Sequence, residues 1–361
     1  MNNCSIIIPT HNRKKLLERC IKYYEEDVFL KNKIIILDSS KKKFKYNFKK
    51  NFLYLNAKNK SFNSKILFGI KKSKTKYVIL SNDDDFISSY GLNKGINFLN
   101  KNKKYSSIQG EFIFFRNLDF LNITTFVEAY FDTLKYNLNF RQNFSIDRVK
   151  NIYLKRPHWY NALHHKKNLE ISYSIANKGN DLHFSELIIP LVIGFKGYVK
   201  TGNFFWYAKD SNVYKNLAIV EQKKRKNMLN EILSNNSPIK KEINKFILKS
   251  SGKNIKNLSK FNYIIKVFFS RYLLDAKHNS KLSIIKKFKN LLHLFLPILI
   301  KNLLRVVINY IKNNSFENSS YKKKYGPTNN NMSIRDWQLI KKHIKDFDEK
   351  YNYKHIYKNL K

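Results

Sequence analysis

Three adjacent carboxylates, Asp83, Asp84 and Asp85, are the residues of this 361-residue sequence best suited to carry chemistry. They directly follow the apolar run 77–80, whose aromatic and β-branched residues are typical of a buried strand. Carboxylates this close repel one another and need a cation, and Mg²⁺ or Mn²⁺ suits them because both prefer oxygen ligands and share them with substrate phosphates. In an extended or turn backbone, Asp83 and Asp85 would point the same way. The alternative is a solvated acidic turn that caps the next helix.

Acidic residues are scarce in this chain, which makes the cluster unusual. Lys and Arg number 70 against 26 Asp and Glu, and the formal net charge is +44. Such a balance is typical of proteins that meet nucleic acid, an anionic membrane surface or a phosphorylated substrate. However, the lysines are spread along the whole chain, and residues with A/T-rich codons abound, so we expect base composition to explain much of the charge.

The first 210 residues alternate predicted strands with predicted helices. Apolar runs predict strands at 5–9, 33–38 and 51–55, and apolar residues at helical spacing predict helices at 61–72 and 91–100. This alternation predicts an α/β fold with a mostly parallel sheet and flanking helices. Ligands of such sheets bind at the carboxyl ends of the strands, where the three acids lie. No Gly-rich dinucleotide motif and no P-loop is present.

The next part of the chain is predicted to complete this domain. A strand across the site is expected at 106–115, a helix at 184–195 and a closing strand at 198–207. The stretch 122–150 is less readable, and we assign it a helix and a mobile loop.

Composition changes near residue 210, and we divide the chain accordingly. A mainly helical and basic region is expected at 211–312, followed by an Asn- and Ser-rich linker at 313–332 and a terminal amphipathic helix at 333–361. Ser237 and Pro238 are typical of a helix start, and Gly252 suits the end of that helix.

The segment 291–311 is apolar with a polar stripe. Its uninterrupted apolar run, 291–300, is shorter than the roughly 20 residues that span a bilayer. Lys301, Arg305 and Asn309 recur every fourth residue, which predicts an amphipathic helix. This helix would either pack on the protein or lie in an anionic membrane interface, and flanking lysines keep the two options balanced.

The terminal helix is predicted from a start signal and an apolar seam. Ser333 followed by Asp336 resembles a capping box in which Asp replaces Glu. Five large apolar residues then follow at three- and four-residue steps: Trp337, Ile340, Ile344, Phe347 and Tyr351. Because the seam is short, we expect it to dock on the protein rather than to form a coiled coil.

The two cysteines, Cys4 and Cys20, fall on a predicted strand and a predicted helix, without zinc-type spacing. Both are expected to be core residues, which fits a reducing compartment. We expect no signal peptide, because no basic segment with a long apolar region is visible before the first strand. We therefore expect a cytoplasmic protein, with peripheral attachment to the inner face of the cell membrane as an option.

Three motifs, taken in order, resemble the family 2 inverting, nucleotide-sugar-dependent glycosyltransferases with a GT-A fold. They are residues 6–10 with Asn12 and Arg13, residues 34–40, and the strand that leads into residues 83–85. Residues 106–110, and Glu186 with Leu187, are similar to a bacterial subgroup of these enzymes. The resemblance covers about residues 1–210.

The resemblance implies a donor site at the sheet edge. The family commonly has Asp-Asp-Gly-Ser where this chain has Asp38-Ser39-Ser40, so one acid is missing and the identity of the base is less certain. Asp38 would accept hydrogen bonds from the base or ribose. By this resemblance, the nucleotide-sugar would contact Pro9, Thr10, Arg13, Asp38, Asp83 and Asp84, while Asp83 and Asp85 would hold Mn²⁺ or Mg²⁺.

The implied reaction also needs a base that accepts the acceptor hydroxyl proton. Family members carry this carboxylate at the start of a helix after the acidic motif, and both Glu186 and Asp181 fit that description. Alternatively, Asp181 only caps the helix and Glu186 only offsets its dipole. His158, Trp159, His164 and His165 are candidates for the acceptor cleft, with Trp159 and His164 preferred.

The resemblance thus implies a metal-dependent glycosyltransferase that would move a sugar from a nucleotide-sugar donor, expected to be UDP-linked, to a hydroxyl acceptor with inversion. A glycan or lipid-linked acceptor in bacterial surface polysaccharide synthesis is expected. Two alternatives remain. One is a catalytically inactive GT-A-like scaffold associated with a membrane. The other is a basic nucleic-acid-binding protein, although we find neither clustered basic residues interleaved with aromatics nor a known module.

Overall fold

The computed structural model describes residues 3–28, 30–118, 126–131, 138–155, 159–210, 227–268 and 331–351. His158, the segment 291–311 and nearly all of the predicted linker lie outside these ranges.

A mixed sheet forms the centre of the molecule. Its strands follow the order β3-β2-β1-β4-β9-β6-β10-β5, with β7 added on β6 and β8 added on β10. The strand bounds are β1 Cys4–Thr10, β2 Lys33–Asp38, β3 Phe52–Asn56, β4 Tyr77–Leu80, β5 Phe86–Ile87, β6 Tyr105–Leu118, β7 Phe126–Phe131, β8 Asn139–Phe140, β9 Leu163–His165 and β10 Tyr198–Asp210.

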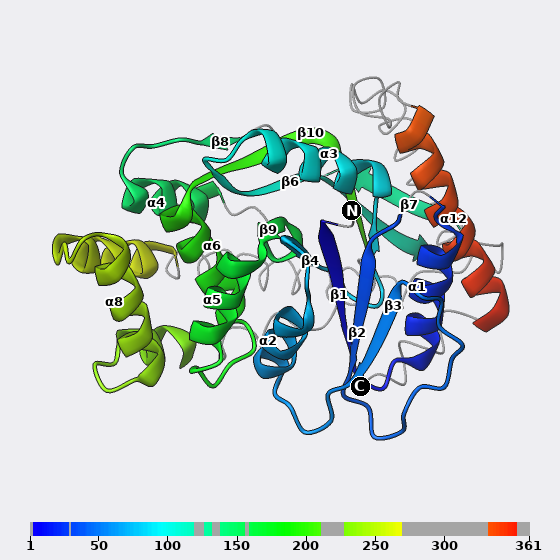
Figure 1. The fold of residues 1–361 in the computed structure, drawn as a ribbon, viewed down its shortest axis with the longest axis horizontal. Helices are drawn as coiled ribbons and strands as arrows, with labels where there is room; N and C mark the ends of the chain where they lie inside the picture. The colour runs from blue at the N-terminus through cyan, green and yellow to red at the C-terminus, as the bar shows by residue number, and fades with distance from the viewer. Residues whose placement is uncertain are drawn as a thin grey trace, which may run out of the picture.

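Helices cover both faces of this sheet (Figure 1). Their bounds are α1 Lys14–Glu26, α2 Phe62–Lys72, α3 Ser89–Lys101, α4 Ser145–Lys155, α5 Lys166–Ala176, α6 Phe184–Lys196, α8 Pro238–Ser250 and α12 Asn331–Tyr351, with a 3₁₀ turn η2 at Trp159–Asn161. Residues 256–268 are also helical.

The parallel pairing expected from the sequence is present. β1 pairs in parallel with β2 and β4, β2 pairs with β3, and β6 pairs with β10. Four short or added strands pair antiparallel instead: β5 and β8 on β10, β7 on β6, and β9 between β4 and β6. β9 places His164 opposite Val78 and Ser107. The predicted α/β architecture with a mostly parallel sheet is confirmed.

Alternation along β1 divides the core into two apolar clusters. Ile6 and Ile8 pack on the α1 and α3 side, while Ile7 packs with α2, α5 and α6 on the other side. In Figure 1, α2, α5 and α6 lie on one side of the sheet and α1 with α12 on the other. Because both faces are covered, strands such as 77–80 consist entirely of apolar residues.

A third apolar cluster joins α4 and α6 to α8 and the helix 256–268. Ser237 occupies the N-cap position of α8, as predicted, but its hydroxyl makes no capping hydrogen bond. Gly252 follows the helix with φ +63°, a conformation that glycine adopts without strain. The assignment for 122–150 is only partly right, because β7 and β8 precede α4 and the loop that was expected there contains strands.

α12 begins at Asn331, so the capping box predicted at Ser333 is wrong. Ser333 already lies inside the helix, and the carboxylate of Asp336 binds another helix. Ile340 and Ile344 are buried, and with Trp337 they pack into the core cluster on the α1 side. The terminal helix therefore docks on α1 and α3.

Both cysteines are fully buried and free. Burial raises the pKa of the Cys4 thiol and of the Cys20 thiol. Among the described helices, none is long and apolar enough to cross a membrane.

Candidate active site

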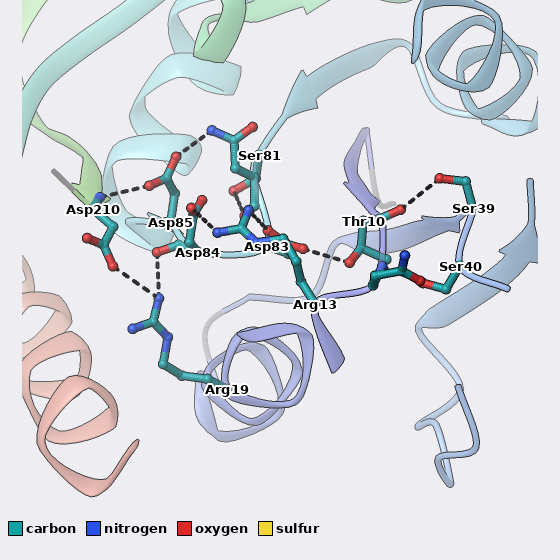
Figure 2. Close-up of polar contacts among 12 residues, drawn as sticks. Thr10, Arg13, Arg19, Ser39, Ser40, Ser81, Asp83, Asp84, Asp85 and Asp210 are labelled. Atoms are coloured by element: carbon teal, nitrogen blue, oxygen red, sulfur yellow. Dashed lines mark hydrogen bonds and ion pairs between the residues drawn. The ribbon is translucent and has the colours of Figure 1, made fainter. Parts of the chain in front are cut away.

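The ends of three neighbouring strands bring the predicted donor residues together. Thr10 ends β1 and Asp38 ends β2, and the two are opposite one another in the parallel register. The acidic residues follow the end of β4, which pairs with the other edge of β1. The Thr10 hydroxyl accordingly donates a 2.6 Å hydrogen bond to Asp83 (Figure 2). Pro9, one residue earlier in β1, is buried opposite Leu37.

Arg13 bridges two of the three acids. Its Nη1 lies 2.6 Å from Asp83 Oδ1, and its Nη2 lies 2.5 Å from Asp84 Oδ2 (Figure 2). The planar guanidinium presents two donors that one ammonium could not place this way. The side chain of Arg13 is 22% exposed, whereas that of Asp83 is 1% exposed, so the arginine covers the acid from the solvent side.

Asp85 is held by three donors from different parts of the chain. Its Oδ2 accepts from the Tyr207 hydroxyl at 2.8 Å and from Asn82 Nδ2 at 2.7 Å. Its Oδ1 accepts from the Asp210 backbone N–H at 2.8 Å. These contacts fix the orientation of a side chain that is nearly fully buried.

Arg19 of α1 supports the acidic loop from within the core. Its Nη2 donates to the Asp84 carbonyl at 2.7 Å and lies 3.7 Å from Asp210 Oδ2 (Figure 2). Because Asp210 also holds Asp85, Arg19 links the end of β10 to the loop after β4.

Burial of these acids changes their protonation. Burial raises the pKa of Asp83 to about 6, although the Arg13 guanidinium opposes the rise. Burial, followed by the neighbouring Asp84 carboxylate, raises the pKa of Asp85 to about 7. The protein thus keeps its acidic loop in an environment that favours the uptake of a proton or of another cation.

The part of the site that is predicted to bind the nucleotide contains a buried acid and a buried cation. Asp38 accepts from the Tyr54 hydroxyl at 2.6 Å and from the Ser40 backbone N–H at 2.8 Å. Lys65 of α2 donates to the Thr10 carbonyl at 3.0 Å and to Ser39 Oγ at 2.9 Å. Burial lowers the pKa of Lys65, with Asp83 and Asp38 opposing the change. Lys65 therefore brings a positive charge next to the predicted nucleotide pocket.

The two predicted bases lie near the start of α6 in different surroundings. Asp181 Oδ1 accepts from the His183 backbone N–H at 2.8 Å and lies 2.7 Å from His183 Nδ1. Glu186, in the first turn of α6, is exposed, and within the described ranges its carboxylate has no hydrogen-bond partner. Burial raises the pKa of the Tyr160 phenol, and the charges of neighbouring groups, Glu186 among them, add to the rise.

Trp159 and His164, the two residues preferred for the acceptor cleft, are enclosed in this structure. Trp159 is 2% exposed and packs edge-on against Phe140. His164 is fully buried in β9, where its Nε2 lies 2.8 Å from the Trp159 carbonyl oxygen, and burial lowers its pKa to about 4. His165 Nε2 lies 3.2 Å from the Tyr105 carbonyl oxygen. Contact of these residues with an acceptor stays a prediction.

The acids fit a small divalent cation only if the substrate completes its coordination. No group of three or more His, Cys, Asp or Glu converges as a metal site in the described part of the chain. Mg²⁺ commonly takes one or two carboxylates and fills its other positions with phosphate and water. The hydrogen bonds to Asp85 from Tyr207, Asn82 and Asp210 are of the kind that orients a ligating carboxylate.

Four site residues escaped the sequence analysis, namely Arg19, Lys65, Tyr207 and Asp210. Arg19 and Lys65 occur on predicted helices where charged residues are common. Tyr207 ends a strand predicted at 198–207, and Asp210 lies beyond that predicted strand, although β10 extends to it in the structure. The sequence does not show that these side chains are buried, although Arg19, Lys65 and Asp210 are each less than 5% exposed in the structure.

Residues 5–167 match the family model described as glycosyl transferase family 2. This part of the chain is a glycosyl transferase family 2 domain. The match contains the acidic loop, Arg13, Asp38 and Lys65, and it confirms the predicted family resemblance and the GT-A type of α/β fold. The family 2 domain is that of a glycosyltransferase, so the predicted enzyme class is also confirmed.

Solved structures similar to this chain include those of S. aureus TarS. Residues 1–349 of TarS match with a TM-score of 0.40 and 11% identity over 70% of this chain and 73% of that chain. Those residues in complex with UDP-GlcNAc match with a TM-score of 0.38 and 10% identity over 73% of this chain and 80% of that chain. Another TarS structure matches with a TM-score of 0.37 and 10% identity over 70% of this chain and 44% of that chain. No curated protein matches the sequence.

Proposed function

We propose that the protein transfers a sugar from a UDP-linked donor to a hydroxyl acceptor, with inversion at the anomeric carbon and with the help of Mn²⁺ or Mg²⁺. The observation that carries the proposal is the position of the acidic loop: inside the family 2 match, it meets Thr10 and Arg13 at the carboxyl edge of the sheet. A bacterial surface glycan is the proposed product.

The nucleoside would occupy the end of β1 and β2. Asp38 is available there as a hydrogen-bond acceptor, oriented by Tyr54 and Ser40. Lys65, which contacts Thr10, and Arg13, which contacts Asp83, carry positive charges beside this position and would attract the diphosphate. Thr10 and Pro9 would supply the backbone wall, and Asp83 and Asp84 would face the donor.

The departing diphosphate gains negative charge as its bond to the sugar breaks. Charges placed in advance at that position lower the barrier. Asp83 and Asp85 would hold the divalent cation, which supplies this positive charge when bound.

Glu186 is the proposed base and Asp181 the second candidate. Glu186 would accept the acceptor hydroxyl proton while the hydroxyl oxygen attacks the anomeric carbon and the nucleoside diphosphate leaves with the electrons of the broken bond. A base must have an oxygen that is accessible to the acceptor. Glu186 is exposed, whereas Asp181 Oδ1 is engaged by His183.

The acceptor would be a glycan or a lipid-linked glycan near Trp159 and His164. The region after residue 268 would bring the protein to an anionic membrane surface on the cytoplasmic side. Lys286, Lys287 and Lys289 support this proposal through their charge.

The test is a calorimetric titration of UDP with and without Mn²⁺, on the wild-type chain and on Asp85→Asn. We expect binding that depends on Mn²⁺ and is lost in the variant. Asp147→Asn on α4 serves as the matched control, because this acid lies outside the described site and should leave binding unchanged. Failure of UDP, GDP and CDP to bind the wild type would refute the proposal in favour of an inactive scaffold.

A further inference from the structure

The carboxylate of Asp336 is completely buried, although it belongs to the C-terminal helix α12. A buried carboxylate is costly unless other groups neutralise it and donate hydrogen bonds to it. In Figure 1, α12 lies beside α1, and its contacts also reach α3. Asp336 thus lies where α12 meets the helix that follows the acidic loop.

Asp336 binds the first turn of α3. Its Oδ2 accepts from Ser88 Oγ at 2.6 Å and from the Tyr90 backbone N–H at 3.0 Å. Ser88 is the N-cap of α3, and its own oxygen accepts from the Gly91 N–H at 3.0 Å. Helix starts leave N–H groups without intrahelical partners, and they favour negative charge. Asp336 provides both a hydrogen-bond acceptor and a negative charge for the start of α3, from more than 240 positions away in the sequence.

The turn that Asp336 holds is close to the acidic loop. Only β5, a strand of two residues, separates Asp85 from Ser88. Ser88 N–H also donates to the carbonyl of Trp206 in β10, and the hydroxyl of the next residue, Tyr207, donates to Asp85. A movement of the α3 start would therefore reach Asp85 through a very short piece of backbone.

A second route connects α12 to the same segment. His343 packs edge-on against Tyr23, with 5.8 Å between ring centroids. The Tyr23 hydroxyl donates to the Ile87 carbonyl at 2.7 Å. One turn earlier on α1, Arg19 donates to the Asp84 carbonyl. The segment from the acidic loop to the start of α3 is thus held by α1 and α12 together.

We propose that Asp336 is a positioning residue for glycosyl transfer: by capping α3 it keeps Asp83–Asp85 in their donor-binding arrangement, so the donor site is complete only when α12 is docked. This inference rests on the proposed donor site. It adds a residue from outside the family 2 match, which ends at residue 167.

The first test measures UDP binding in the presence of Mn²⁺ by calorimetry on full-length variants. Asp336→Ala should raise the Kd for UDP about tenfold while the stoichiometry stays near that of the wild type. Asp336→Asn should raise the Kd less, because its amide oxygen still accepts a hydrogen bond. Asp346→Ala is the matched control, since this acid is exposed on the same helix, and its Kd should equal that of the wild type.

A purely structural role gives a different titration. If Asp336 only stabilises the fold, the folded molecules of Asp336→Ala bind UDP with the wild-type Kd and only the stoichiometry falls. An unchanged Kd with reduced stoichiometry would overturn the proposal.

Hydrogen exchange provides a readout that needs no ligand. The Asp210 amide donates to Asp85 Oδ1, so its exchange rate reports on the placement of Asp85. We expect faster exchange at residues 83–92 and at Asp210 in Asp336→Ala, but not in Asp346→Ala. Faster exchange confined to α12 and the first turn of α3 contradicts the inference. Should wild type bind no nucleotide, the proposed function fails, whereas this exchange comparison still decides the role of Asp336.

Discussion

The Tyr207 hydroxyl donates a 2.8 Å hydrogen bond to Asp85 across 122 positions of sequence. The same hydroxyl accepts from Asn161 Nδ2 at 2.9 Å, so β10, the acidic loop and the turn before β9 meet at one phenol. Burial also raises the pKa of Tyr207. Tyr207 therefore remains a neutral donor near neutral pH and orients Asp85 without adding charge.

Loss of this hydroxyl should weaken the site without removing its acid. We expect Tyr207→Phe to reduce transfer about 10- to 100-fold, the usual effect of removing a group that orients a ligating side chain.

Asp85→Asn should abolish transfer while the circular dichroism spectrum keeps its wild-type form. Near-normal turnover of Asp85→Asn would remove the proposed metal role of this residue.

Arg13 should matter for its shape as well as for its charge. Arg13→Lys keeps the charge but cannot reach both Asp83 and Asp84 with a planar pair of donors. We expect kcat/KM to fall about tenfold or more, as for loss of a charge-assisted pair. Lys14→Arg, at an exposed neighbouring position, is the control. Equal kinetics for Arg13→Lys and the wild type would show that only the charge is needed.

The two candidate bases can be separated by paired amide substitutions. Glu186→Gln should reduce kcat about 100-fold or more, the scale of general base catalysis, and leave the Kd for UDP unchanged. Asp181→Asn should mainly lower thermal stability, because its carboxylate bonds the N–H of His183 at the start of α6. The reverse pattern in kcat would transfer the role of base to Asp181.

Glu111 predicts a pH dependence of stability. It is buried in β6 opposite Phe205, and burial raises its pKa to about 7 from an ordinary value of 4.5. Between these two values the folded protein binds more protons than the unfolded chain, so this residue makes stability fall as pH rises from about 4.5 to 7.

Urea unfolding of the wild type and of Glu111→Gln over this pH range measures the effect. The variant should show a smaller decline in the free energy of unfolding, because its amide does not titrate. Parallel curves for the two proteins would mean that Glu111 is not protonated in the folded state.

The basic segment before residue 291 should govern binding to anionic vesicles. We expect substitution of Lys286, Lys287 and Lys289 by Gln to reduce binding to vesicles with anionic lipids, by about 1 kcal/mol per lysine near the surface. These substitutions are preferable to deleting 280–361, which also removes Asp336. Unchanged sedimentation with vesicles would rule out a membrane role for this segment.

The location of the candidate site could be predicted from the sequence because its residues lie at the ends of predicted strands. Thr10, Asp38 and the acidic loop each follow an apolar run, and parallel strands bring such ends to one edge. The hydrogen bonds that orient these residues were not predictable. They depend on which residue of a distant element reaches the loop, as with Arg19 and Asp84 or Lys65 and Thr10.

The surroundings of His164 and Asp336 could not be read from the local sequence pattern. An antiparallel strand that the sequence analysis did not foresee buries His164 between β4 and β6, and its contact with an acceptor stays a prediction. Asp336 was assigned to its own helix because of its distance from Ser333, whereas its carboxylate binds α3. In both cases a long-range contact outweighs the local signal.

The two enclosed thiols give the protein a practical advantage. Cys4 and Cys20 are the only cysteines of the sequence, both are fully buried, and burial suppresses the thiolate form that reacts with maleimides. A cysteine introduced at a surface position would therefore be labelled selectively, because the two native thiols react poorly with the dye. One dye attached at Asp346→Cys on α12 and another at an exposed position of α2, such as Lys71→Cys, would report on the docking of the C-terminal helix in single molecules during turnover.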